Sequence, residues 1–416
     1  MNIEVCTKRR NLKRGSVTVY AMYFGVSLIL LVTALINGAQ TILVRNGANA
    51  LGDLWASSIL GEYDKELYRR YGILAYYGDE GTVKNKLEFY ADYTFGDKRY
   101  ASCHVKGVEL YDYSLITPEN VMKQIRKETL KEMAEGLLSG RDEGPVRYDN
   151  GEGEAGSGRL IDSALAEGLP SYGKTSSLSI DYAKELIEKL TSLESIVTEG
   201  TDSFILNKYI KNNFRNVYFA TPEESTYLYG EQEYILSGRN TDEANRKSAR
   251  NKIIALREVL NMVYLESNPE LRDACIAAGE VITLGQGGPA AGHAIMAAWA
   301  LAESINDYEL LIHGKPVSFF KNESCWAIDL DSVLENESRG CVDTGYGIGD
   351  DYTDYLMYLL YLTGENTKIL RMLDLIELNL RETYYGGLRL QDYYVGVRYS
   401  LNANGEEYSF TDVYER

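Results

Sequence analysis

A long uncharged segment near the N-terminus limits what this chain can fold into more than any other feature. No Asp, Glu, Lys or Arg occurs between Arg14 and Arg45, and residues 17–36 read VTVYAMYFGVSLILLVTALI. As a helix, about 20 such residues would be ~30 Å long, which is the thickness of the hydrocarbon core of a bilayer. A cleaved secretory signal would have a shorter apolar core and a clearer small-x-small site than ALINGAQ. The segment therefore predicts a retained, single-pass transmembrane helix.

The charges around this segment predict its orientation. It follows a basic cluster of Lys8, Arg9, Arg10, Lys13 and Arg14, whereas the whole chain has a net charge of −18 and a pI near 4.8. By the positive-inside rule, the N-terminus is cytoplasmic and the chain after Arg45 is an extracellular domain of a cell-membrane protein. An acidic ectodomain argues against a nucleic-acid partner, because phosphate binding needs a clustered positive surface.

The helical pattern continues beyond the predicted membrane span. Apolar residues recur at three- and four-residue steps, which is one face of a helix: Leu51, Leu54, Trp55, Ile59, Tyr63, Leu67 and Tyr71. Gly72 follows where a C-terminal glycine cap belongs, and no proline precedes Pro118. We therefore predict one transmembrane and stalk helix over residues 16–72.

The start of this helix resembles a known class of small pilus proteins. KRGSVTVYAMYFGVSLILLV (13–32) is similar to the N-termini of the minor pilins and pseudopilins of tight-adherence (Tad) pili, of the TadE/TadG type. The resemblance implies cleavage of the basic leader after Gly15, so that Ser16 becomes the new N-terminus. That family usually has Glu five residues after the cut, whereas this chain has Tyr20.

Four longer blocks resemble an uncharacterised family of single-anchor envelope proteins from clostridial-type Gram-positive bacteria, often associated with Tad-like pilus genes. The blocks begin LGEYDKEL, EQEYILSG, HAIMAAWA and DYTDYLMY, and they occupy residues 60–74, 231–265, 293–317 and 351–381. The resemblance implies an envelope location. It supplies no catalytic residues, since none is established for that family.

Local patterns predict an α+β fold, with a mostly helical ectodomain and a small antiparallel sheet. Strand composition occurs at 100–116 and at 393–414, where Asn404-Gly405 suits a tight hairpin turn. We expect these strands to pair and to cover the stalk helix. Helices are expected at 118–139 and at Tyr182–Leu193, Ser203–Phe214, Asp242–Leu265, Glu270–Ile282, Ala290–Ile312 and Asp351–Leu380.

The resulting domain prediction has six consecutive parts. They are a cytoplasmic leader (1–15), the transmembrane and stalk helix (16–72), a first ectodomain segment (73–139), a flexible linker (140–178), a helical ectodomain (179–382) and a C-terminal hairpin (383–416).

The predicted linker contains GLPSYGKT, from Gly168 to Thr175, which matches the spacing of a phosphate-binding loop. A working loop follows a buried strand and leads directly into a helix. Here the preceding IDSALAE is not a strand, and Pro170 lies within the loop. We interpret the match as chance in a segment rich in Gly and Ser.

No other motif predicts a cofactor, a metal or a catalytic group. His104, His293 and His313 lack the spacing of zinc ligands, and His293 reads as a core or capping residue. DTGYGIGDDYTD (343–354) could bind Ca²⁺, but acidic residues are expected where the helix at 351 begins. The apolar run 290–302 is too short for a second membrane span and predicts a buried helix.

Five cysteines leave the redox state open. Cys103, Cys275, Cys325 and Cys341 fall on the predicted outer side of the membrane, and Cys6 on the inner side. Two disulfides are possible, of which Cys325–Cys341 is the most local. Free buried thiols are the alternative.

These observations favour a non-enzymatic, membrane-anchored envelope protein that acts as an accessory or pseudopilin-like component of a Tad-type pilus or a secretion system. Its expected partners are the membrane and other pilin-like or secretion-system proteins. The alternative is an anchored extracytoplasmic hydrolase or ligand-binding protein. A cleft lined by carboxylates of raised pKa would favour that alternative.

Overall fold

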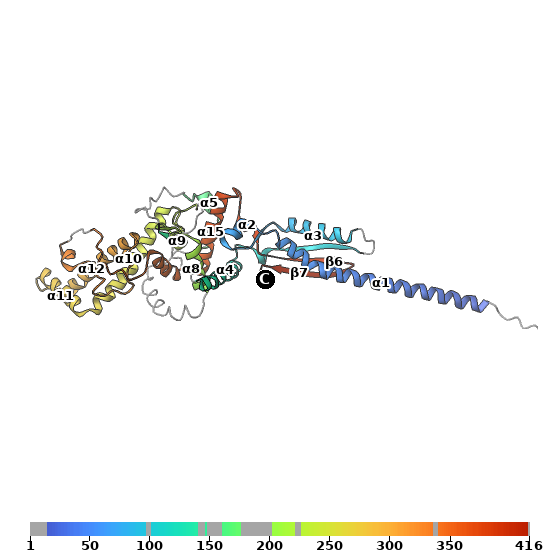
Figure 1. Ribbon diagram of the computed structural model, residues 1–416, viewed down its shortest axis with the longest axis horizontal. Helices are drawn as coiled ribbons and strands as arrows, with labels where there is room; N and C mark the ends of the chain where they lie inside the picture. Colours follow the sequence, from blue (N-terminus) through green and yellow to red (C-terminus); the bar gives the residue numbers. More distant parts are fainter. Residues whose placement is uncertain are drawn as a thin grey trace, which may run out of the picture. The chain divides into compact units, whose positions relative to one another are not determined.

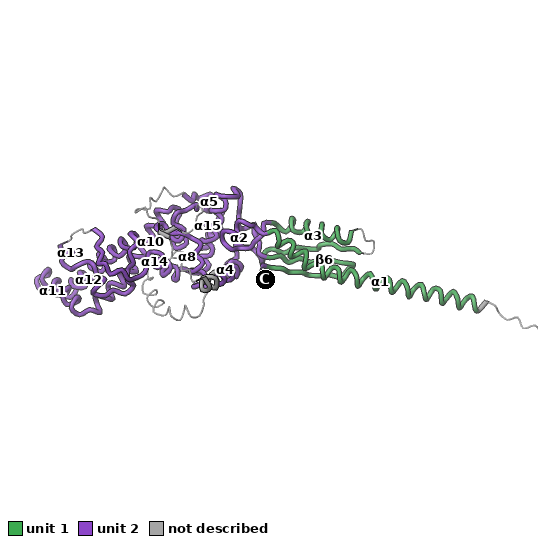
Figure 2. The backbone as a smooth tube through the Cα atoms, viewed as in Figure 1, with its two compact units in different colours: residues 1–62, 78–112, 396–413 green, residues 63–77, 113–395, 414–416 purple. Residues whose placement is uncertain are grey.

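The chain forms two units, each assembled from segments that are distant in sequence. A computed structural model describes residues 15–96, 101–139, 146–147, 160–175, 202–220, 226–335 and 340–414. Unit 1 combines Met1–Glu62, Gly78–Asp112 and Gly396–Val413, and unit 2 combines Tyr63–Tyr77, Tyr113–Val395 and Tyr414–Arg416 (Figure 2). Both units are built from segments that are far apart in sequence, so they do not coincide with the six consecutive parts expected from the sequence.

Unit 1 is built on a helix that extends well past its sheet. Helix α1 (Gly15–Leu60) packs its C-terminal half against β6 (Gly396–Ala403) and β7 (Glu406–Val413) (Figure 1). The buried positions of α1 lie on one face and begin at Val44: Val44, Ala48, Gly52, Trp55, Ala56, Ile59 and Leu60. Apolar residues at this spacing form the stripe that an amphipathic helix turns toward a core.

The sheet of unit 1 has three antiparallel strands in the order β2-β6-β7, with β2 at Cys103–Glu109. The β6–β7 ladder runs from Gly396↔Val413 to Ala403↔Glu406, and positive φ at Asn404 and Gly405 closes the hairpin. Helix α3 (Glu80–Phe95) contacts β2. The predicted pairing of both strand segments, with the sheet against the N-terminal helix, is confirmed.

The prediction of one helix through Tyr71 was wrong at its end. Helix α1 ends at Leu60, and a separate helix α2 (Lys65–Tyr71) follows. Asp64 caps α2, because its side chain accepts hydrogen bonds from the backbone N–H groups of Glu66 and Leu67 at 2.9 and 3.1 Å. Gly72, with φ of 66°, is the predicted C-terminal cap.

Unit 2 is mainly helical. Besides α2 its elements are α4 (Pro118–Ser139), α5 (Ser163–Glu167), α8 (Asp202–Asn213), α9 (Glu231–Ser237), α10 (Asp242–Ser267), α11 (Pro269–Ile282), α12 (Gly288–Ile312), α13 (Leu330–Leu334), α14 (Tyr352–Tyr361), α15 (Glu365–Thr383), the short pairs β1 (Tyr76–Tyr77) with β5 (Tyr393–Tyr394) and β3 (Val146–Arg147) with β4 (Phe219–Ala220), and the 3₁₀ turn η2 (Leu390–Asp392). A second 3₁₀ turn, η1 (Tyr111–Tyr113), crosses the boundary between the two units in sequence. The α+β class is confirmed.

Helix α15 is the centre of the unit 2 core. Every residue from Lys368 to Leu380 is buried, and a helix buried on all sides is typical of the interior of a larger domain. The prediction of one helix over 351–380 was wrong, because α14 and α15 are separated at Leu362–Gly364. Gly364 has ψ of 137°, which ends the helical path, and α15 begins directly after it. The predicted helix Tyr182–Leu193 lies outside the described residues.

Residues 160–175, expected within a flexible linker, are packed instead. Ile161 and Leu169 belong to the unit 2 core, and Pro170 is also buried. The backbone N–H of Ser171 donates to Asp374 on α15 at 2.9 Å. The few apolar residues of this segment fill space in the core of unit 2. Such packing depends on distant residues, so no local sequence pattern predicts it.

Candidate functional site

The N-terminal part of α1 is a candidate membrane anchor. Residues 17–60 include a window with mean hydropathy 2.3, none of which is buried in the chain. From Val17 to Leu43 the large apolar side chains are exposed, among them Phe24, Leu28 and Leu31. The helix is therefore long and apolar enough to cross a membrane. Gly15 and Ser16, the predicted processing site, are its first two residues, and the basic cluster lies outside the described residues.

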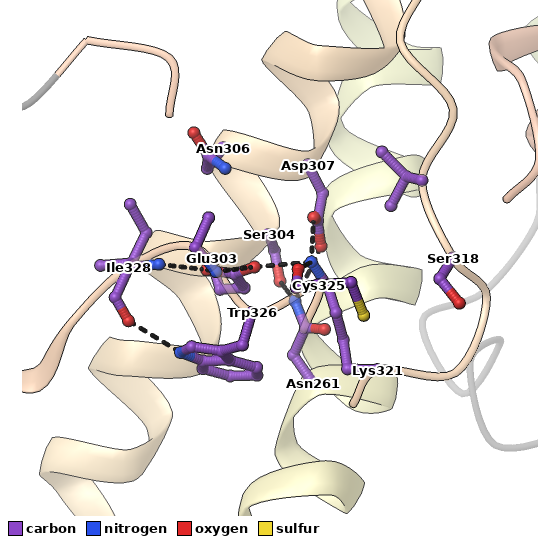
Figure 3. A network of polar contacts seen from close by, with 12 residues as sticks. Asn261, Glu303, Ser304, Asn306, Asp307, Ser318, Lys321, Cys325, Trp326 and Ile328 are labelled. Atoms are coloured by element: carbon purple, nitrogen blue, oxygen red, sulfur yellow. Dashed lines mark hydrogen bonds and ion pairs between the residues drawn. The ribbon is translucent and has the colours of Figure 1, made fainter. Parts of the chain in front are cut away.

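A network of buried charges joins α10 and α12 of unit 2 (Figure 3). Arg257, Asp307 and Glu303 are fully buried, and the Lys321 side chain is 2 % exposed. The Nζ of Lys321 lies 2.6 Å from Glu303 Oε1 and 2.7 Å from Asp307 Oδ1. Arg257 Nε donates to Asp307 Oδ2 at 2.9 Å. Two cations and two anions are thus paired away from water.

Neighbouring backbone groups also form hydrogen bonds with the charged side chains of this network. Glu303 accepts hydrogen bonds from the N–H groups of Ala327 and Ile328, the latter at 2.8 Å. Arg257 donates to the carbonyls of Ser318 and Phe319 at 3.0 and 2.8 Å. These contacts hold the segment 318–328 against two helices. Since each carboxylate oxygen already accepts a hydrogen bond, the network serves to position this loop.

The two acids of the network respond differently to their surroundings. Burial raises the pKa of Glu303, and it does so despite the nearby Lys321 ammonium. Burial also acts to raise the pKa of Asp307. The nearby Arg257 guanidinium and Lys321 ammonium outweigh it and hold the pKa of that carboxyl below its usual value. Asp307 is therefore the charge on which both cations depend.

Sequence analysis missed this network, although a signal was present. Glu303 and Asp307 are four residues apart, on the same helical face as the buried Trp299 and Ala300. Arg257 and Asn261 repeat that spacing on α10 and are both fully buried. Paired charges on an otherwise apolar helical face indicate buried ion pairs.

A second polar cluster clamps the chain before α9. Three consecutive side chains at the start of α9, those of Glu231, Gln232 and Glu233, are buried. Glu231 accepts from the N–H of Arg215 at 3.0 Å, and Glu233 accepts from that of Val217 at 3.1 Å. Gln232 donates to the carbonyl of Phe214 at 2.7 Å. These side chains thus pair with the backbone N–H and C=O groups of residues 214–217. In a sheet, a neighbouring strand would pair with such groups.

Several carboxylates in unit 2 have raised pKa values. Burial raises the pKa of Glu233 to about 7, that of Glu377 to about 7 and that of Asp374 to about 6. Each accepts a hydrogen bond from a nearby backbone N–H: Val217 for Glu233, Leu390 for Glu377 and Ser171 for Asp374. Each of these three buried carboxylates therefore holds a backbone segment in place, which is a structural use of an acidic group.

These raised values make unit 2 less stable as pH rises. In the unfolded chain the same groups titrate near pH 4, so between about pH 5 and about pH 7 the folded chain binds more protons, and its free energy of unfolding falls with pH. We expect unfolding by urea to need less denaturant at pH 7 than at pH 5. Glu233→Gln should reduce this difference, whereas Glu266→Gln, at an exposed position of α10, should leave it unchanged. An unfolding midpoint that rises from pH 5 to pH 7 would contradict the assignment.

GLPSYGKT does not have the structure of a phosphate loop. The short helix α5 precedes it, and the described residues before it contain no strand that leads into the loop. The N–H of Ser171, which could have faced a phosphate, donates to the Asp374 carboxylate. Lys174 is exposed. The segment is a packed turn.

Other residues considered for metal binding are also accounted for. His104, His293 and His313 are all exposed, and His293 lies inside α12, so the prediction of His293 as a core or capping residue was wrong. Among the described residues, no group of three or more His, Cys, Asp or Glu could hold a metal ion. Asp351 caps α14 in a capping box with Asp354, as expected for acids at a helix start. The helix over 290–302 was predicted to be buried, but only one of its faces is buried and the other is exposed.

The cysteines in the described residues carry free thiols. Cys103, Cys275 and Cys325 are buried, and Cys341 is exposed. Cys325 Sγ accepts a hydrogen bond from the N–H of Asn322 at 3.1 Å. A Cys325–Cys341 disulfide therefore stays a prediction for oxidising conditions.

The fold and the anchor define a class of protein: an α+β chain with one N-terminal helix long and apolar enough to cross a membrane. The chain belongs to a family of unknown function, DUF5702, whose model matches residues 159–405. Three of the four blocks noted in the sequence, 231–265, 293–317 and 351–381, fall within this range, and the block at 60–74 precedes it. No curated protein matches the chain, and no solved structure does.

Proposed function

We propose that this protein is a membrane-anchored envelope protein that works as a pilin-like accessory component of a pilus or a secretion system. The observation that carries the proposal is the division of α1. Its N-terminal half exposes apolar side chains such as Phe24 and Leu31, whereas its C-terminal half packs on a three-stranded antiparallel sheet. A single helix that is half anchor and half domain core is the plan of a pilin-like subunit.

The mechanism follows from the exposed half of the helix. Large apolar side chains on all sides of a helix are stable in a lipid bilayer and not in water. Within the bilayer this helix can pack against helices of other subunits, while the outer domain presents contact surface. The leader is removed after Gly15 in this proposal. Tyr20 in place of the usual Glu removes a carboxylate, which favours an accessory role over incorporation along a filament.

The proposed orientation places unit 2 outside the cell, and Cys341 can report it. We expect a membrane-impermeant maleimide to label Cys341 on intact cells, because this thiol is exposed whereas Cys103, Cys275 and Cys325 are buried. The signal is measured as the mass shift of the purified protein after mild reduction.

The Cys341→Ser variant is the matched control and should lose the label. A cytoplasmic protein with an exposed cysteine, unlabelled in the same cells, shows that the membrane stayed intact. Labelling of Cys341 only after lysis would reverse the proposed orientation. Labelling that requires the reductant would instead show that Cys341 is oxidised in the cell.

A further inference from the structure

The hairpin of α11 and α12 in unit 2 has an unusual distribution of apolar side chains. At its tip Val281, Ile282 and Leu284 are 75 %, 63 % and 91 % exposed. The contact between the two helices is made instead by glycine. At the tip, large apolar groups therefore face outward while glycine makes the closest helix contact, whereas further along α12 Met296 and Trp299 are buried.

Three glycines let the helix backbones approach closely. A Cβ at Gly279 would lie 2.6 Å from the carbonyl oxygen of Gly288 and 2.6 Å from the nitrogen of Gly292. A Cβ at Gly292 would lie 2.7 Å from the Cα of Ile276. Gly288 and Gly292 form a G-x-x-x-G pair, and small residues at a helix contact are how helices pack in lipid.

The hairpin also carries almost no charge. From Ala274 to Ala302 the only Asp, Glu, Lys or Arg is Glu280. The face of α12 that turns away from the core is mostly apolar as well: besides the exposed imidazole of His293, it is formed by Ala290, Ala294, Ala297, Ala298, Leu301 and Ile305, all exposed. An uncharged surface of this kind is suited to hydrocarbon.

Four backbone donors of the turn between the helices are paired within the turn. The N–H groups of Thr283, Leu284 and Gly285 donate to carbonyls of residues 279–281 at 3.0, 3.3 and 2.8 Å. The N–H of Gln286 donates to Thr283 at 3.1 Å. Unsatisfied backbone groups are the main obstacle to placing a turn in lipid, and these four donors are already paired.

The composition of the tip separates lipid from a protein partner. Protein interfaces concentrate Tyr, Trp and Arg at their centre and polar residues at their rim. The chain has 34 Tyr, yet none lies between Leu265 and Asp307, and no Arg occurs from Asp273 to Asp307. The one Trp in this stretch, Trp299, is buried.

We propose that the tip of the α11–α12 hairpin, residues 281–284, inserts into the interfacial layer of a lipid bilayer. Insertion of an apolar helix end to about 5–10 Å is typical of interfacial segments, and one to two turns of α11 span that depth. Because Glu280 adjoins the tip and the chain is acidic, zwitterionic lipid is the expected surface. The hairpin would be a membrane contact additional to α1.

The test places a fluorophore at the tip of the full-length protein in phosphatidylcholine proteoliposomes. Leu284→Cys is labelled with an environment-sensitive dye after Cys6 and Cys341 are replaced by Ser. We expect the dye to emit at shorter wavelength than the same dye free in aqueous buffer, and we expect spin-labelled phosphatidylcholine to quench this emission. Protein-free vesicles are present in excess, and the quencher is placed either in them or in the proteoliposomes, so that either bilayer is detected.

Matched variants make the result specific. Asp273→Cys labels the other end of α11 and should show neither the shift nor the quenching. Adding Val281→Asp and Ile282→Asp to the Leu284→Cys protein should abolish both, and the helical circular dichroism should persist because these side chains are exposed. Leu28→Cys reports insertion of α1, so a failure of the anchor is distinguished from a failure of the hairpin.

Two results would overturn the proposal. Water-like emission from the dye at position 284 would show that the tip stays in solution. A shift to shorter wavelength without quenching by the spin-labelled lipid would show that the tip is covered by protein.

Discussion

Replacing Asp307 by asparagine should lower the free energy of unfolding by about 3–5 kcal/mol, the range for breaking a buried ion pair from one side. Asp307 is fully buried and pairs with Arg257 at 2.9 Å and with Lys321 at 2.7 Å. Asparagine has nearly the same shape but no charge. Lys321 would keep Glu303 as an anionic partner, but Arg257 would lose the carboxylate with which it pairs, so the energy of keeping this cation out of water would no longer be offset.

The measurement is urea unfolding of the full-length protein in detergent, followed by circular dichroism and tryptophan fluorescence. Trp299 and Trp326 both donate to the carbonyl of Ile328 at 2.7 Å, so their emission reports on the loop that the network holds. Asp273→Asn is the control, because Asp273 makes an exposed pair with Arg272 at 3.4 Å and surface pairs contribute about 0–1 kcal/mol. If both variants unfold at the same urea concentration, Asp307 does not hold the network together.

Gly52→Ala should destabilise unit 1 by about 1–3 kcal/mol, the usual effect of overpacking. In an isolated helix the same change would stabilise by up to about 1 kcal/mol, so the sign of the effect is diagnostic. A Cβ at Gly52 would lie 2.3–2.5 Å from ring carbons of Phe410 on β7. The carbonyl of Gly52 also accepts a hydrogen bond from the hydroxyl of Tyr399 at 2.8 Å. Any shift of α1 away from Phe410 would therefore stretch this bond.

The thermal transition of unit 1 can be followed through Trp55, which is buried and lies edge-on to Phe95 with ring centroids 6.4 Å apart. Gly107→Ala on β2 is the matched control, because a Cβ there meets nothing within 4 Å. Its transition should stay close to that of the wild-type protein. An increase in the midpoint for Gly52→Ala would show that α1 is not seated on β7, and the pilin-like plan of unit 1 would have to be abandoned.

The sequence by itself determined the features that depend on residues close together in the chain. The uncharged run 17–36 predicted a helix long and apolar enough to cross a membrane, because about 20 consecutive residues without charge match the thickness of a bilayer. Asn404-Gly405 determined the hairpin, since both residues adopt positive φ. Gly72 ended α2 for the same conformational reason. Membership of a family of unknown function, to which three of the quoted blocks within residues 159–405 belong, also needed no structure.

Tertiary structure decided whatever depends on residues that meet across long distances in the chain. The helix expected to run through Tyr71 ends at Leu60, and the side chain of Asp64, which begins α2, also accepts a hydrogen bond from the hydroxyl of Tyr393 at 2.9 Å. GLPSYGKT became a packed turn because Asp374, two hundred residues away, accepts from its backbone. The charges of Arg257, Glu303, Asp307 and Lys321 could be buried only because they pair with one another. Whether a buried charge stabilises or destabilises the protein depends on its partner, and the fold determines which residue that partner is.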